Sequence, residues 1–265
     1  MPPILAREIA DYVFEIAPNP PGRTENTWHY GGPDVPVTGV AVAWWITPEI
    51  FQDMPTHGLN FALSHETVTF SLPGQCLWGT LPESVWDIQT NRNIRDLVER
   101  HNMAAHQFHS NVDLAPWGMP RALVAQLGWD ALPADWSRGV PVITLPPRPL
   151  AQLVHEIKLK LDLPFVRWDG EPERVVSRVA VAWGGLCQSW AAAMCAAPLG
   201  FDTLLGGDII DGVVRLARGQ GWTVIDAMHH TTEMDAMRIL AGKLRQRFPN
   251  LPIRFYPNTS PWRVS

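Results

Sequence analysis

The chain has 265 residues, of which 46% are hydrophobic and 18% charged, and its formal net charge is −5 at pH 7. This composition excludes a disordered chain or a small disulfide-stapled scaffold, and the length suffices for one large α/β domain or two joined lobes. Basic residues form no stripe, which argues against a nucleic-acid-binding protein. The three cysteines have no CxxC spacing, and charges interrupt the N-terminal apolar residues. We therefore expect reduced thiols, no secretion signal and a cytoplasmic location.

Hydrophobic periodicity in the first half of the chain predicts alternating helices and strands. In chain order these are a helix over 5–16, a strand over 39–44, a helix that begins after Thr47, a strand over 59–63, an amphipathic helix near 94–101 and a strand-like segment over 103–108. The proline-rich segment 132–149 predicts a hinge, which divides residues 1–265 into lobes of about 1–145 and 146–265.

The second half of the chain predicts the same alternation. Its elements are a helix over 150–161, strands over 165–168 and 175–183, a helix over 188–197, a strand over 201–205, a helix opened by Gly206-Gly207-Asp208, a strand over 222–228, a helix over 232–248 and a strand over 253–256 that closes the second lobe. The uncharged stretch 179–201 is long enough for a membrane span, but glycine and glutamine interrupt it, so we expect a strand, a turn and a short helix. The alternation predicts an α/β fold with mainly parallel sheet.

Histidines and acids occur together after three of the predicted strands: His65 with Glu66, His109 with Asp113, and His229 with Glu233. Ligands of α/β proteins bind beyond the carboxyl ends of strands. Mixed imidazole and carboxylate donors suit divalent ions such as Zn, Mn or Fe, and five or six donors could hold two ions.

Each pair also has an explanation without metal. His65 could bond to its own loop, and His109 could simply pack. Asp113 could organise the turn before Pro116, and Glu233 could interact with a helix dipole. The coincidence of three such strand ends favours a metal site.

Other conspicuous residues give weaker indications of a functional site. His230 is expected to lie behind any ligands or in solvent, and Cys187 is expected to be a small buried residue. Gly184-Gly185 is a weak phosphate-binding signal. Without basic neighbours, the 13 tryptophans indicate core and oligomer contacts instead of base stacking.

Three motifs carry a resemblance to a known family. Ser64-His65-Glu66-Thr67 resembles "T-H-H-P", His109-Ser110-Asn111-Val112-Asp113 resembles "H-T-N-L-D", and Met228-His229-His230-Thr231-Thr232-Glu233 resembles "G-H-Y-x-T-E". With flanking matches at 40–47 and 203–208, the chain resembles the Nif-three-like family from about Val37 to Pro257. This family is named after NGG-one-interacting factor three; its YbgI/YqfO-type members are often labelled GTP cyclohydrolase I type 2.

The resemblance implies a single Nif-three-like domain with two related α/β lobes, a dinuclear metal cleft between them, and assembly as a hexamer. It implies that His65, Asp113, His229 and Glu233 are metal ligands, with Glu233 bridging. Glu66 replaces the second histidine of the first motif, which favours Mn, Mg or Fe over Zn. In the family's "G-D/E-x-x-x-H" element, this chain has Gly212 in place of the histidine. A lost ligand could leave one ion in place of two, so one or two ions per chain are expected. The "W-D-N-x-G" element is matched only by Glu25-Asn26-Thr27-Trp28.

These features predict a metal-dependent hydrolase in which Glu233, Glu66 or His109 moves protons. The family label suggests a small-molecule substrate that is a nucleotide or another phosphorylated compound. The alternative is a non-catalytic metal-binding scaffold with an interaction or regulatory role. No membrane partner is expected.

Overall fold

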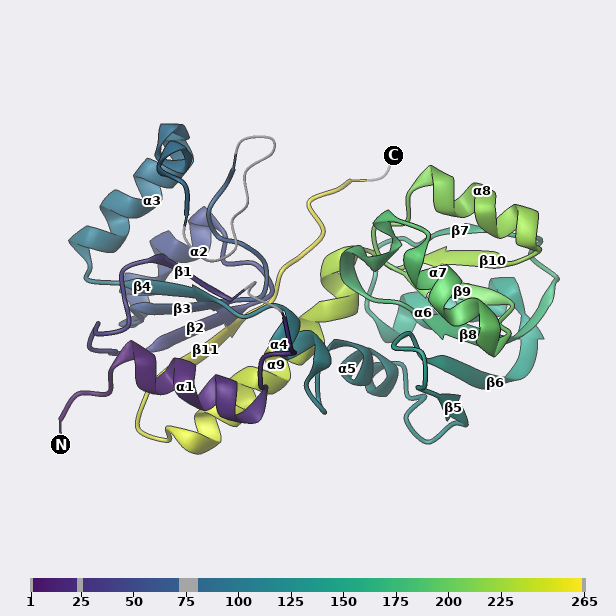
Figure 1. Ribbon diagram of the computed structural model, residues 1–265, viewed down its shortest axis with the longest axis horizontal. Coiled ribbons are helices and arrows are strands. Elements are labelled where there is room, and N and C mark those ends of the chain that lie inside the picture. Colours follow the sequence, from purple (N-terminus) through teal and green to yellow (C-terminus); the bar gives the residue numbers. More distant parts are fainter. Residues whose placement is uncertain (1, 23–25, 72–80, 264–265) are drawn as a thin grey trace. The chain divides into compact units, whose positions relative to one another are not determined.

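A computed structural model describes residues 2–22, 26–71 and 81–263 and divides the chain into two compact units (Figure 1). The first unit is Met1–Gly118 with Ala236–Asn258, and the second is Met119–Asp235 with Thr259–Ser265. The sequence predicted one division near residue 145, whereas the chain passes to the second unit at Met119 and returns to the first at Ala236. Glu25 and Cys76, which the sequence analysis considered, lie outside the described residues.

The first unit is built around a five-stranded sheet in the order β1-β4-β3-β2-β11. Its elements are α1 (Ala6–Ile16), β1 (Thr27–Tyr30), β2 (Val40–Ala43), α2 (Pro48–Asp53), η1 (Met54–His57), β3 (Phe61–Ser64), η2 (Glu83–Asp87), α3 (Gln89–Arg100), β4 (Ala104–Gln107), α4 (Ser110–Leu114) and β11 (Ile253–Tyr256). The β2, β3, β4 and β11 strands pair in parallel, and β1 pairs with β4 in the antiparallel direction. Side chains from α2 and α3 pack on one face of the sheet.

The last strand occupies a different sheet from the one that the sequence predicted. Chain order suggested that 253–256 closes the second lobe, but β11 pairs in parallel with β2, with Ile253 opposite Val40. The β2 strand is buried along its whole length, so its free edge requires a partner for its backbone groups. The Val40 N–H donates to the Pro252 carbonyl at 2.8 Å, which fixes the start of this pairing.

The second unit contains a six-stranded sheet in the order β5-β6-β8-β9-β10-β7. Its elements are α5 (Met119–Gln126), β5 (Ala134–Asp135), β6 (Val142–Pro149), α6 (Leu150–Lys160), β7 (Arg167–Asp169), β8 (Val175–Val181), η3 (Gly184–Gln188), α7 (Ala191–Ala196), η4 (Ala197–Leu199), β9 (Thr203–Gly206), α8 (Asp211–Gln220) and β10 (Thr223–Asp226). Parallel β8, β9 and β10 form the middle of the sheet, and antiparallel strands flank them. The long helix α9 (His229–Arg247) begins in this unit and ends in the first.

The proline-rich segment is part of this sheet and is not a hinge. β5 and β6 pair with each other, and β6 continues the sheet through β8. The register between β6 and β8 shifts between Thr144 and Arg148, where Pro146 and Pro147 cannot donate backbone hydrogen bonds. The prolines therefore interrupt the ladder without ending the strand.

The uncharged stretch 179–201 forms the predicted strand, turn and short helix. It contains the end of β8, then η3, and then α7, whose Ala192, Ala193 and Ala196 are buried in the core of the second unit. None of the helices in the described ranges combines the length and the apolar composition that a bilayer crossing requires.

Candidate metal centre

His65 is placed by the parallel pairing of β3 and β4 in the first unit. It is the first residue after β3 and is fully buried, with 0% of its surface exposed. Its backbone N–H donates to the Trp44 carbonyl at 3.0 Å, and its ring Nδ1 donates to the Phe108 carbonyl at 3.1 Å. Because Nδ1 carries the proton in this bond, the ring nitrogen that bears a lone pair in the neutral form is Nε2. The Nε2 atom lies 3.6 Å from Asp113 Oδ1.

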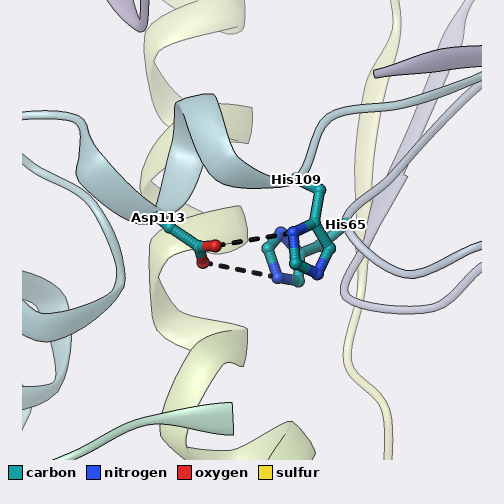
Figure 2. Close-up of side chains that lie close together, drawn as sticks. All are labelled: His65, His109 and Asp113. Atoms are coloured by element: carbon teal, nitrogen blue, oxygen red, sulfur yellow. Dashed lines mark ion pairs between the residues drawn. The ribbon is translucent and has the colours of Figure 1, made fainter. Parts of the chain in front are cut away.

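His109 and Asp113 face His65 from the end of the adjacent strand (Figure 2). His109 precedes the first residue of α4, and Asp113 lies four residues later, so both side chains share one helix face. His109 Nδ1 lies 3.5 Å from Asp113 Oδ2, and the His109 ring stacks on that of His65 at 4.4 Å. One donor atom from each of the three residues lies within 4.8 Å of the others.

The spacing of these atoms is slightly wider than that of two ligands bound to one divalent cation. At 3.5 and 3.6 Å, the nitrogen–oxygen distances exceed those of ordinary N–H···O hydrogen bonds, which measure about 2.7–3.2 Å. Two ligand atoms bound at about 2.1 Å to one ion are separated by roughly 3.0–3.4 Å. Two imidazoles and a carboxylate are also a donor set that Zn, Mn and Fe accept.

A second histidine–carboxylate group lies in the second unit. His229 and Glu233 are four residues apart in the first turns of α9, and His229 Nε2 lies 3.1 Å from Glu233 Oε2. On the other side of the ring, His229 Nδ1 donates to Asp208 Oδ2 at 2.9 Å. This hydrogen bond is the main cause of the lowered pKa of Asp208. A carboxylate that holds one ring nitrogen in this way directs the other nitrogen toward a metal ion.

Gly184 gives the second group its space. Its backbone has φ +51°, and a Cβ atom there would overlap Glu233 Oε1 and lie 2.9 Å from His229 Nε2. The Gly184 N–H donates to Thr232 Oγ1 at 2.8 Å. Glycine is therefore required for the close approach of the Glu233 carboxylate. The glycine pair, which the sequence analysis considered for phosphate, thus accommodates a carboxylate side chain.

The structure thus brings together His65, His109 and Asp113 in one unit, and His229 and Glu233 in the other. Glu66 follows His65 directly, is half-buried, and donates its backbone N–H to the Trp44 carbonyl at 2.8 Å.

Two further residues that the sequence analysis considered, His230 and Cys187, are both buried. The Nε2 atom of His230 lies 3.2 Å from Thr231 Oγ1. Burial of the His230 ring lowers its pKa. Cys187 is buried, and burial raises the pKa of its thiol to about 12, so it is no thiolate nucleophile at neutral pH.

Sequence reasoning missed two supporting residues. Asp208 was noted as the start of a helix and as part of a family motif, but not as a partner of His229, whose ring its carboxylate orients. Asn26, at the weakly matched N-terminal element, accepts the His109 backbone N–H at its Oδ1, at 2.9 Å. A carboxylate after a strand was a usable signal for Asp208, whereas nothing in the spacing linked Asn26 to a residue 83 positions away.

The fold and these side chains define a class of protein with two α/β units that carry largely buried or half-buried histidine–carboxylate groups near strand ends. The family model of Duf34/NIF3 (NGG1p interacting factor 3) matches residues 24–261. The chain therefore belongs to this family.

Known relatives agree with that assignment. A "GTP cyclohydrolase 1 type 2 homolog" of Methanothermobacter thermautotrophicus is 34% identical over 133 residues, which is 50% of this chain and 56% of the relative. The match thus spans little more than half of that relative. A Bacillus cereus protein related to NIF3 has a TM-score of 0.81 at 15% identity, and a Staphylococcus aureus hypothetical protein has 0.78 at 19%; both comparisons cover 100% of each chain. At these identities the solved structures show a shared fold.

Proposed function

We propose that this NIF3 family member binds one or two divalent ions and uses them in hydrolysis. The metal ligands in this proposal are His65, Glu66, Asp113, His229 and Glu233. The observation that supports it is the arrangement of His65, His109 and Asp113, which each offer one ligand atom within 4.8 Å of the others. His109, assigned to proton transfer from the sequence, is positioned to serve as a further ligand.

The chemistry of the donors supports a transition metal. Nitrogen donors from imidazole favour Zn, Mn or Fe over Mg, which prefers an all-oxygen shell. When bound, such an ion would lower the pKa of a water molecule to near neutrality and polarise a substrate oxygen.

The side chains of the chain supply the remaining parts of a hydrolytic reaction. Glu233 is almost completely buried, with 4% of its surface exposed, and Gly184 fixes the space available to its carboxylate. Asp208 holds the His229 ring in one tautomer. Proton transfer is assigned to Glu233, Glu66 or His109, because each combines a basic atom with a position in or beside a candidate ligand group.

The substrate class follows from analogy with the Methanothermobacter relative, which is named as a GTP cyclohydrolase 1 type 2 homolog. We propose a nucleotide or another phosphorylated small molecule. We also propose that the protein functions in the cytoplasm, where Cys187 and Cys195 remain thiols, and as a homo-oligomer, for which the family resemblance implies a hexamer. Trp190 and Met194, which are 60% and 50% exposed, offer apolar surface for self-association. The alternative is a metal-binding scaffold without turnover.

A screen of nucleotides and phosphate esters with the metal-loaded protein distinguishes the two functions. Glu233→Ala is the test variant, and Glu173→Ala, an exposed acid of the same unit, is the matched control. Turnover by the wild type and the control, with loss in Glu233→Ala, supports the hydrolase. A protein that binds metal but turns over none of these compounds would support the scaffold. Light scattering measures the oligomeric state independently.

A further inference from the structure

The first unit contains a cavity of about 380 Å³ that the candidate metal centre does not use. It lies among the end of β1, the η2 turn, the C-terminal half of α3 and Met103, which precedes β4. His109 follows the other end of β4, so the cavity and the histidine cluster lie at opposite ends of that strand. Its volume falls within the range of small-molecule sites, about 300–1,000 Å³.

Arg95 provides the positive charge of this cavity. Its guanidinium carbon lies 4.9 Å from the centre of the Trp86 ring, a cation–π arrangement. Within residues 2–22, 26–71 and 81–263, Arg95 forms no ion pair with a carboxylate, whereas other arginines do so. A guanidinium that stacks by its face retains in-plane N–H donors for a planar anion.

The other titratable groups of the cavity limit the charge of a ligand. Burial lowers the pKa of His29 to about 4 and raises the pKa of Tyr30 to about 12, so both are neutral at pH 7. Glu99 lies one helical turn after Arg95 and is exposed. One cation with a carboxylate beside it suits a monoanion better than a phosphate dianion, because the carboxylate repels a second negative charge.

The remaining part of the cavity wall is largely apolar. Tyr30 and Trp86 lie with their ring centres 5.8 Å apart, and Val35, Val98 and Met103 complete the lining. Tyr30, Val98 and Met103 are almost fully buried. An apolar ligand body of modest size therefore replaces water against a preformed surface.

We propose that this cavity binds a small monocarboxylate with an apolar body, whose carboxylate pairs with Arg95 and whose body contacts Tyr30, Val35 and Val98. This inference is independent of the proposed metal chemistry, since no candidate metal ligand lines the cavity.

Calorimetric titration of the full chain with phenylacetate tests the proposal. We expect saturable binding to the wild type and an affinity at least about tenfold lower in Arg95→Gln, because a charge-assisted bidentate pair is lost. Arg100→Gln, an exposed arginine of the same helix outside the cavity, is the matched control and should bind as the wild type does. Circular dichroism verifies that the variants are folded.

Two further arms make the result decisive. Glu99→Gln should tighten phenylacetate binding about two- to threefold, because it removes a repulsive charge. If Arg95→Gln does not fold, the affinity of Glu99→Gln tests the proposal in its place. Phenethylamine should not bind, and inorganic phosphate should bind more weakly than phenylacetate. The proposal is overturned if the wild type does not bind phenylacetate, if Arg95→Gln or Glu99→Gln leaves the affinity unchanged, or if phosphate or the amine binds more tightly.

Discussion

Substitution of Gly184 by alanine separates backbone strain from displacement of the Glu233 carboxylate. Gly184 has φ +51°, where an L residue costs about 1–2 kcal/mol. The added Cβ would also overlap Glu233 Oε1, so that the carboxylate has to retreat by on the order of 1–2 Å to reach van der Waals distance. Metal–oxygen distances tolerate deviations of only about 0.2 Å. We therefore expect Gly184→Ala to lower the affinity for Zn²⁺ or Mn²⁺ by at least about tenfold, as loss of a supporting contact does.

Gly200→Ala is the matched control for this change. Gly200 has φ +69°, in the same unit, and a Cβ there meets no atom within 4 Å. Both variants should lose unfolding free energy as apo proteins, because both glycines have positive φ, and chemical denaturation measures this loss. Only Gly184→Ala should also lose metal affinity, measured by competition with a chromophoric chelator. Equal metal affinity in the two variants would refute the assignment of Glu233 as a ligand that requires Gly184.

Three further predictions concern stability and the orientation of the metal ligands. Burial lowers the pKa of His29 from 6.5 to about 4 and that of His106 to about 3. Between pH 6.5 and the lowered pKa values, the two histidines bind protons in the unfolded chain but not in the folded chain. The free energy of unfolding should therefore fall as the pH drops from 6.5. His29 alone contributes about 3 kcal/mol of this loss by pH 4. Denaturation curves at pH 7 and pH 4 measure this loss. The prediction is contradicted if the wild type and His29→Gln each keep the same denaturation midpoint at both pH values. Asp208→Asn should weaken metal binding about tenfold, because the charged partner of His229 is lost; isothermal titration detects this, and an unchanged affinity would show that Asp208 has no orienting role. Phe51→Ala should cost about 3–5 kcal/mol in urea denaturation, since Phe51 is fully buried, and a cost below about 1 kcal/mol would mean that the site repacks.

The sequence predicted the elements that carry their own periodicity. The helix expected over 150–161 is α6, and the one expected over 5–16 is α1, because each keeps apolar residues on a single buried face. Strand ends were equally readable: His65 follows β3 and His109 follows β4, and parallel pairing then brings them together. Local pattern thus indicated the histidines and acids of both groups, including His229 and Glu233.

Features that depend on long-range pairing were not readable. The residues 253–256 do not by themselves indicate pairing with β2. The pairing depends on the open edge of the sheet at β2, which lies 213 positions earlier in the chain. The same applies to Gly184, whose importance comes from a side chain 49 positions away, and to the prolines of β6, which are compatible with a hinge or with an irregular strand. In each case the deciding contact is tertiary.

The central claim is tested most directly by the metal content per chain. It is measured in the wild type and in His65→Ala, Asp113→Ala and Glu233→Ala. Each protein is loaded with Zn²⁺ or Mn²⁺, desalted and measured by mass spectrometry of the elements, with His101→Ala, an exposed histidine, as the control. Bound metal should fall in each of the three variants and stay at the wild-type level in the control, with circular dichroism unchanged. Unchanged metal content in all three folded variants would contradict the assignment of these residues as metal ligands.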